Sequence, residues 1–249
     1  MAKDSRLALS FGTEAAAYDS GRPGYPLDAV EWVLGLAATD DGKRPDVVDV
    51  GAGTGKLTAA FEGRAASVTA VEPDAQMRAR LSANLPGVTA VEGTGEAMPL
   101  GDDSADVVTF AQSWHWVDVP AASAEVARVL RPGGVLALLW NVRDEREDWV
   151  AQLTRVIGGS IAEEYETASP PVAAPLVRDA YAEFRWSRTL DHDRLTALVT
   201  SRSSVIALAE PERATLLAEL DELVRTHPSL AGRSTFELPY TTRVTIARA

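Results

Sequence analysis

Residues 47–58, VVDVGAGTGKLT, carry the residue types that could bind a nucleotide-like ligand. The apolar, β-branched run that ends at Val50 is typical of a strand buried on both faces. The glycines that follow let the backbone turn tightly and approach a ligand closely; they are Gly51, Gly53 and Gly55. The acidic residue Asp49 lies just before this turn, so the segment predicts a ligand site at the end of a strand.

The next segment repeats the strand pattern and adds a second carboxylate. Leu57, Ala60 and Phe61 recur at helical spacing, which predicts a helix from about Thr54 with its amino end at the ligand. A strand follows at 67–72, and Glu72 comes 21 positions after Gly51 (72 − 51). An acid at this place can accept both hydroxyls of a ribose.

Glycine spacing separates three possible ligands. A dinucleotide site needs G-x-G-x-x-G, but the third glycine comes one position early and Lys56 stands in its place. A P-loop needs four residues between its glycines and Ser or Thr after the lysine, whereas this chain has three and then Leu57. Neither standard phosphate-binding pattern fits.

The pattern resembles motif I of the class I S-adenosylmethionine-dependent methyltransferases, in which an acid and one further residue precede G-x-G-x-G. The resemblance continues in register over about a hundred residues. VEPDAQM resembles the ribose-binding segment and GTGEAMPL the adenine-binding segment of that family. DVVTFAQSWHW resembles its fourth strand, and LRPGGVLALLW resembles the turn into its fifth strand.

This resemblance implies roles for individual residues. Asp49 would order the glycine loop and bind the methionine ammonium group, and Glu72 with Pro73 would bind the ribose. Glu96 with Ala97 would hold the adenine, although Glu96 could also be a solvated loop acid. The loop backbone would line the approach to the cofactor through Gly51, Ala52, Gly53 and Gly55.

Residues 111–118, AQSWHWVD, place two tryptophans and a histidine after the fourth predicted strand. Ligands bind at this edge of open α/β sheets. The segment resembles the Q-x-x-H-W pattern of the branch similar to trans-aconitate methyltransferases, which implies that Gln112 and Trp116 contact the cofactor and makes His115 a candidate base. Alternatively, Trp114 and Trp116 are core anchors and His115 a satisfied neighbour.

The amino-terminal YDSGRPGYP also resembles that branch, where this segment covers the cofactor. Arg22 would then pair with the methionine carboxylate, and residues 1 to about 25, with Tyr18 and Tyr25, would form a lid. Glycine and proline suit an ordinary surface linker equally well. Arg202, Ser203 and Ser204 are candidate acceptor contacts.

Composition excludes several other kinds of site. The 249 residues have a net charge of −12 and a pI near 4.7, without dense Lys or Arg runs, so nucleic acid is not expected as a partner. There is no cysteine, and the three histidines are too scattered for a zinc pattern. The longest apolar run, 135–140, is strand-sized, and the first residues lack a signal-peptide core. We therefore expect no metal, no membrane contact and a cytoplasmic location.

Alternating strands and helix-sized intervals predict a Rossmann-like, doubly wound α/β fold. Strands are expected at 46–51, 67–72, 88–92, 105–111 and 134–140, with later ones at 182–190 and 238–248. Helices are expected at 27–37, 191–203 and 211–226. The family resemblance implies a mostly parallel seven-stranded sheet with one antiparallel strand.

We expect one domain over 1–249, divided into segments where the amino-acid composition changes. Residues 1–40 would form the lid and first helix, 41–140 the cofactor-binding core, 141–181 a helical cap insertion and 182–249 the strands and helices that complete the sheet.

The expected reaction is methyl transfer from S-adenosylmethionine to a small molecule, most readily at oxygen, with a carboxylate ahead of a hydroxyl. Nitrogen and carbon acceptors remain open. Orientation alone supplies about 7 to 11 kcal/mol to such in-line displacements, so a general base is not essential. The alternatives are a non-catalytic S-adenosylmethionine-binding protein and a nicotinamide-dependent oxidoreductase.

Overall fold

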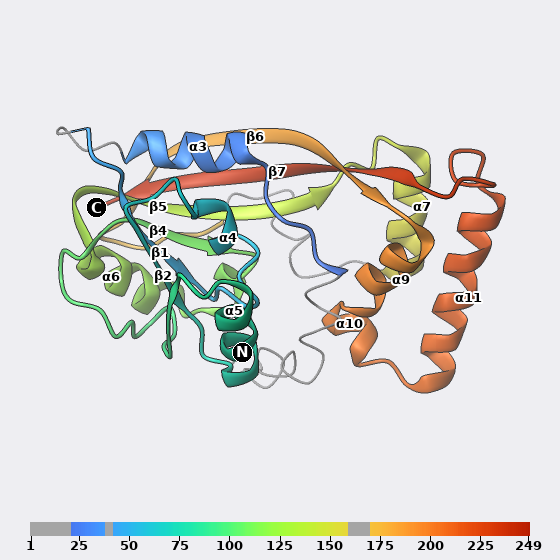
Figure 1. Cartoon of the computed structure of the whole chain (residues 1–249), viewed down its shortest axis with the longest axis horizontal. Coiled ribbons are helices and arrows are strands. Elements are labelled where there is room, and N and C mark those ends of the chain that lie inside the picture. Colours follow the sequence, from blue (N-terminus) through green and yellow to red (C-terminus); the bar gives the residue numbers. More distant parts are fainter. Residues whose placement is uncertain (1–20, 38–41, 159–169) are drawn as a thin grey trace.

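The computed structural model describes residues 21–37, 42–158 and 170–249; the part of the expected lid before residue 21, Tyr18 included, lies outside the described residues. The fold is built on one seven-stranded sheet (Figure 1). Its strands are β1 (Asp46–Val50), β2 (Ser67–Val71), β3 (Thr89–Val91), β4 (Ala105–Ala111), β5 (Leu130–Arg143), β6 (Val177–Leu190) and β7 (Phe236–Arg248). They lie in the order β3-β2-β1-β4-β5-β7-β6.

Strands β1 to β5 pair in parallel, and β7 is antiparallel to both of its neighbours, β5 and β6. The predicted mostly parallel sheet of seven strands with one antiparallel member is therefore confirmed. The central strands are buried on both faces, as their β-branched runs predict.

Helices cover both faces of the sheet. The helices are α3 (Leu27–Leu36), α4 (Thr58–Phe61), α5 (Ala75–Asn84), α6 (Val119–Val129), α7 (Asp148–Ile157), α9 (His192–Thr200), α10 (Ser203–Ile206) and α11 (Glu210–Thr226), with a short 3-10 turn at Trp114–Trp116. Side chains of α3 and α4 pack on one face against Val47, Val107 and Leu139. Side chains of α6 pack on the other face against Val48, Val108 and Leu138.

Several elements differ from the sequence prediction. Helix α4 begins at Thr58 rather than about Thr54, because positive φ angles at the glycines keep the preceding residues in turns. No helix lies between β3 and β4; the interval 92–104, broken by glycine and proline, forms turns and an isolated bridge. Strands β5 and β6 are longer than expected, because the antiparallel β7 extends their pairing as far as Arg143 and Val177.

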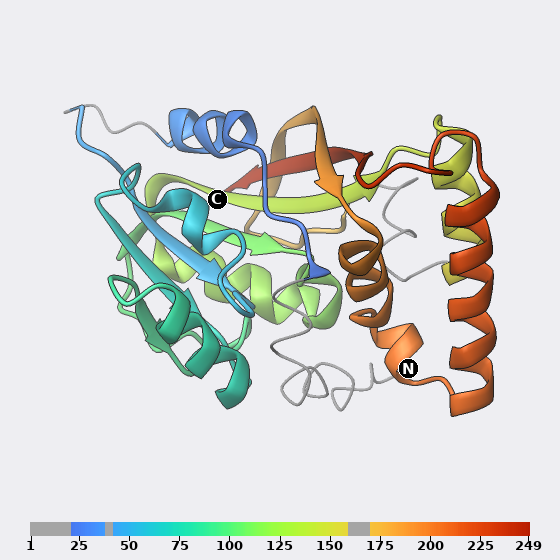
Figure 2. The same ribbon diagram turned by 45° about the vertical axis from the view of Figure 1, so that its right-hand side comes forward.

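A helical lobe lies beyond the carboxyl ends of β5 and β6 (Figures 1 and 2). It consists of α7, α9, α10 and α11, with an apolar core of its own built from residues such as Leu153, Leu195 and Leu220. Helix α7 lies in the segment 141–181 predicted to form the cap, whereas α9, α10 and α11 lie in the segment 182–249, and β6 already begins at Val177. The predicted division of the chain stays a prediction. Among the described helices, none is long and apolar enough to span a membrane.

The lobe core should contribute strongly to stability. Leu220 on α11 is fully buried, so Leu220→Ala should lower the free energy of unfolding by about 2 to 5 kcal/mol through lost burial and the cavity it leaves. Glu219→Ala, at the adjacent exposed position, is the control and should change it by less than about 0.5 kcal/mol. Urea denaturation of the two variants checks this; equal stabilities would mean that the lobe does not unfold with the sheet.

Candidate active site

The candidate site begins where the strand order reverses. Strands β1 and β4 are neighbours, but the chain continues from β1 towards β2 and from β4 towards β5. Their carboxyl ends therefore leave a crevice at the position where open α/β sheets bind ligands. The Ser113 hydroxyl after β4 donates to the Val50 carbonyl of β1 at 2.9 Å, which joins the two loops.

The glycine loop at the end of β1 has a backbone that side chains would disturb. Gly51 and Gly53 have φ angles of +65° and +58°. A Cβ atom on Gly51 would lie 2.7 Å from the Ser113 Cβ. Glycine is therefore required at Gly51 both for conformation and for the close approach of the β4 loop.

Asp49 lies under the glycine loop and is 1% exposed. Its carboxylate accepts hydrogen bonds from the hydroxyl groups of Thr58 (2.6 Å) and Thr109 (2.8 Å). Burial raises the pKa of Asp49 to about 6, and the two threonine hydrogen bonds act in the opposite direction. A cationic ammonium group placed beside this carboxylate would favour its ionised form.

Glu72 stands at the end of β2 and is also buried. Its carboxylate accepts from the backbone N–H of Gly53 (2.7 Å) and of Asp74 (2.9 Å), so it fixes the glycine loop from behind. Burial raises the pKa of Glu72, against the effect of these two hydrogen bonds. A carboxylate offers about four lone-pair positions, which leaves capacity for ribose hydroxyls.

The remaining motif residues take more peripheral places. Gly55, with φ +89°, packs against helix α5, where a Cβ would lie 2.7 Å from Leu85 Cδ1. Glu96 accepts from the Asp118 backbone N–H at 2.7 Å, while the adjacent Ala97 is exposed. Pro73 is exposed after β2. Their predicted contacts with the cofactor stay predictions.

The tryptophan segment divides between core and site. Trp114 is fully buried, stacks edge-on against Phe110 and donates its indole N–H to the Pro171 carbonyl at 2.7 Å. His115 is 8% exposed and packs against the ring of Trp116, which is partly exposed. Trp114 is thus a core anchor, as the alternative interpretation held.

Gln112 has a φ of +57°, an unusual conformation for a residue with a side chain. Its side-chain amide donates to the Asn141 carbonyl at 3.0 Å, and its backbone N–H donates to the Leu139 carbonyl at 3.0 Å. Strained residues of this kind cluster at functional sites.

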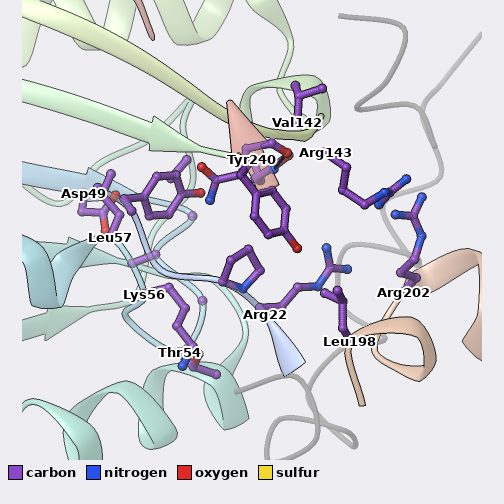
Figure 3. A pocket seen from close by; sticks show the side chains of 18 residues that line it. Arg22, Asp49, Thr54, Lys56, Leu57, Val142, Arg143, Leu198, Arg202 and Tyr240 are labelled. Carbon is purple, nitrogen blue, oxygen red and sulfur yellow. Dashed lines mark hydrogen bonds between the residues drawn. The ribbon is translucent and has the colours of Figure 1, made fainter. Parts of the chain in front are cut away.

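One cavity runs from the glycine loop to the helical lobe (Figure 3). The space that it encloses, together with its open mouth, is about 890 Å³. The described lining residues are Arg22, Pro23, Tyr25, Asp49, Gly51, Ala52, Gly53, Thr54, Lys56, Leu57, Ala111, Gln112, Asn141, Val142, Arg143, Leu198, Arg202 and Tyr240.

The structure therefore brings together part of the predicted set. Of the predicted residues, the cavity is lined by Arg22, Tyr25, Asp49, Gly51, Ala52, Gly53, Gln112 and Arg202. The described lining does not include Gly55, Glu72, Pro73, Glu96, Ala97, His115, Trp116 or Ser204. The structure does not describe the side chain of Ser203.

The far end of the cavity is cationic. Tyr240 of β7 is 4% exposed, and burial raises the pKa of its hydroxyl. Four arginines act in the opposite direction on that pKa: Arg143, Arg188, Arg22 and Arg202. Sequence reasoning missed Arg143 and Arg188, whose only signal is their place at the ends of β5 and β6.

Hydrogen bonds hold the amino-terminal segment against this end. Asn141 donates to the Gly24 carbonyl at 2.9 Å, and Arg188 donates to the Gly21 carbonyl at 2.6 Å. Arg22 itself donates to the Ser201 carbonyl at 3.2 Å, on the helical-lobe side. Arg22, Pro23 and Tyr25 of this segment form part of the cavity wall, and the mobility of the predicted lid stays a prediction.

Charged groups of both signs line the cavity: the carboxylate of Asp49 and the cations of Arg22 and Lys56. The predicted pairing of Asp49 with the methionine ammonium group and of Arg22 with the methionine carboxylate stays a prediction. Among the described residues, no group of three or more acids and histidines could hold a metal ion.

Known proteins resemble the whole chain. An uncharacterized methyltransferase of Mycobacterium tuberculosis is 43% identical over 244 residues, which cover 97% of each protein. An uncharacterized methyltransferase-like protein of Schizosaccharomyces pombe is 31% identical over 241 residues, 94% of this chain and 93% of the relative. The methyltransferase domain family matches residues 48–138.

The fold is similar to a solved structure from Anaeromyxobacter dehalogenans, provisionally described as a type II methyltransferase. The TM-score is 0.68 at 24% sequence identity, over 91% of this chain and 96% of that one.

Gly51 provides a test of the loop geometry. Gly51→Ala should abolish measurable S-adenosylmethionine binding, because the added methyl meets Ser113 and the φ of +65° disfavours alanine. Gly101→Ala, where a Cβ would meet no atom within 4 Å, is the control and should bind normally. Calorimetric titration measures both; normal binding by Gly51→Ala would contradict the predicted loop contact.

Asp49 predicts a pH dependence. Because its folded pKa is raised from 3.8 to about 6, the folded protein without ligand holds a proton that the unfolded chain loses between these values. Its stability should therefore fall as pH rises through this window, by at most about 3 kcal/mol, and Asp49→Asn should remove the fall.

Cofactor binding should have the opposite pH dependence. An ammonium group prefers the ionised Asp49, so affinity for S-adenosylmethionine should decrease, by up to about tenfold per pH unit, as pH falls below about 6. Asp49→Asn should bind more weakly at pH 7 and with little dependence on pH. A wild-type affinity that stays constant from pH 7.5 to 5 would show that Asp49 does not bind the ammonium group.

Proposed function

This chain belongs to the methyltransferase family, and on that premise we propose that it methylates an oxygen atom of a small acceptor, a carboxylate ahead of a hydroxyl. Its cofactor is S-adenosylmethionine. Family membership favours methyl transfer over nicotinamide-dependent hydride transfer and over cofactor binding without catalysis. What we propose is the kind of acceptor and the oxygen as its methylated atom.

The observation that carries this proposal is the continuity of the cavity. The glycine loop and Asp49 line one end, and Tyr240 with Arg143 and Arg202 lines the other. When bound, S-adenosylmethionine supplies an electrophilic methyl group on a sulfonium. The cationic end would hold an acidic acceptor in the same space, despite the net charge of −12, because local charge outweighs distant charge.

The lining favours an acceptor that is already ionised. The described lining residues include no histidine, and Asp49, the carboxylate among them, accepts hydrogen bonds from two threonines. A hydroxyl acceptor would have to lose a proton, whereas a carboxylate is ionised at neutral pH. This supports a carboxylate nucleophile without a general base, and the role of His115 as a base stays a prediction.

A relative supports oxygen as the acceptor atom. A malonyl-[acyl-carrier protein] O-methyltransferase of Pectobacterium atrosepticum is 31% identical over 132 residues, which are 53% of this chain and 51% of that protein. The resemblance to the trans-aconitate branch points the same way and stays a prediction, as do the cytoplasmic location and the absence of nucleic-acid substrates.

The residues of the wall would act mainly by placement. Asp49 and the glycine loop would fix the cofactor. The Gln112 side-chain amide, which donates to the Asn141 backbone carbonyl at 3.0 Å, would form part of the wall against which both molecules lie. Holding both reactants in line lowers the entropic part of the barrier. The segment at residues 21–24 would exclude water from this side.

Methyl transfer to a panel of acids tests the proposal. With methyl-labelled cofactor, the wild-type protein should label at least one small carboxylic acid, and the label should be released by mild alkali, as expected for an ester. Gly51→Ala serves as the inactive control. Alkali-stable products would instead indicate methylation of a hydroxyl, nitrogen or carbon, and would overturn the carboxylate assignment.

A further inference from the structure

The arginines at the far end of the cavity converge from separate parts of the chain. Arg22 precedes helix α3, Arg143 ends β5, Arg188 is near the end of β6 and Arg202 lies between α9 and α10. All four act electrostatically on the Tyr240 hydroxyl. Figure 3 shows the guanidinium groups of Arg22, Arg143 and Arg202 on one side of the cavity, away from Asp49 and Leu57.

The sheet fixes Tyr240 at the centre of this cluster. Tyr240 lies opposite Arg143 in the β5–β7 pairing and opposite Trp186 in the β6–β7 pairing. Its ring stacks on Trp186 with a centroid distance of 5.1 Å and an interplanar angle of 22°. Because stacking fixes the ring, the position of the Tyr240 hydroxyl is fixed as well.

Hydrogen bonds also orient the arginines before any ligand binds. Arg22 donates to the Ser201 carbonyl at 3.2 Å, Arg188 to the Gly21 carbonyl at 2.6 Å, and Arg143 to the Thr154 hydroxyl at 3.2 and 3.3 Å. A site of this kind costs little conformational entropy when it binds an anion. Arginine is also the residue best suited to oxyanions, because its donors match their geometry in pairs.

We propose that the lining residues Arg143, Arg202 and Tyr240 form an anchor site for an anionic group of the acceptor that is not the group methylated. Arg188 does not line the cavity and would support the site from behind by holding Gly21, and Arg22 stays the predicted partner of the cofactor carboxylate. This inference rests on the proposed function and assigns the acceptor to a chemical class. The acceptor carries two functions: an oxyanion, carboxylate or phosphate, held by the anchor site, and a separate nucleophilic oxygen nearer the glycine loop.

The chemistry of the displacement separates the two groups. In this reaction an oxygen lone pair of the acceptor forms the new O–CH3 bond, the C–S bond breaks, and its electron pair stays on sulfur. An oxyanion held by several guanidinium groups has its lone pairs directed at N–H donors and its charge neutralised, so it is a weak nucleophile. The arginines would therefore slow transfer to the group they hold.

The position of the arginines agrees with this separation. Arg202 lies at the carboxyl end of α9, on the helical-lobe side, whereas Asp49 and the glycine loop lie at the end of β1. Gln112, which follows β4, and Asn141, two residues before Arg143 on β5, also line the cavity. The methylated oxygen would lie nearer the glycine loop than the arginines do.

Anion binding tests the anchor site directly. The protein, saturated with S-adenosylhomocysteine, is titrated by calorimetry with acetate, with inorganic phosphate and with acetamide, the uncharged match of acetate. We expect acetate or phosphate to bind at least tenfold more tightly than acetamide. Tighter binding of acetate alone identifies a carboxylate anchor, and tighter binding of phosphate alone identifies a phosphate anchor.

Variants assign the binding to these residues. Arg202→Gln and Arg143→Gln should each weaken binding of the anion at least tenfold, and Tyr240→Phe, which keeps the stacked ring, should weaken it about threefold or more. Arg185→Gln is the control, because Arg185 is exposed on β6 and does not line the cavity. Thermal melting and S-adenosylhomocysteine affinity establish that each variant is folded.

Kinetics distinguish an anchor from a site for the reacting group. With any acid found to be a substrate, Arg202→Gln should raise KM at least tenfold while kcat changes less than threefold. The proposal is overturned if no anion binds, if folded variants bind as the wild type does, or if the variant lowers kcat with KM unchanged. Failure to bind S-adenosylhomocysteine would instead overturn the proposed function, since anion binding can be measured without it.

Discussion

The burial of the Asp49 carboxylate is the constraint on which the rest of the site depends. Its two threonine partners come from different elements, Thr58 from α4 and Thr109 from β4, so one side chain joins the glycine loop to the neighbouring strand. A buried carboxylate needs such partners, because an unsatisfied charge in the core is costly. The same bonds leave the carboxylate at the cavity wall, where a cationic ligand can reach it.

The second half of the site depends on strand length. Strands β5 and β7 pair from Leu136 to Arg143, beyond the part of β5 that pairs with β4. This extension places Tyr240 and Arg143 next to the helical lobe, whose core is separate from the cores on the two faces of the sheet. The cofactor end of the cavity therefore lies beside the cores of the sheet, and the proposed acceptor end lies beside the core of the helical lobe. The same long strands connect the two.

The sequence predicts the parts of the site that are local in the chain. The glycine loop, Asp49 and Glu72 fall within one strand–helix–strand unit, so their spacing alone places them together. The arginines of the cationic end are spread over separate segments of the chain, from Arg22 to Arg202, and a lone Arg143 or Arg188 has no periodicity or spacing to mark it. The tryptophan segment is a third case. Trp114 belongs to the core because its ring packs against Phe110 and its indole N–H donates to the Pro171 carbonyl, and the motif itself does not predict either contact.

Strand β7 is last in the chain but lies between β5 and β6 in the sheet. During synthesis, the glycine loop and β1 to β5 can therefore assemble before β7 is made, whereas β6 has no neighbour to pair with until then. We therefore expect the cofactor half to be able to assemble before the acceptor half. The exposed edge of β5 must meanwhile stay unpaired, which makes that edge the place where a nascent chain is most open to wrong strand pairing.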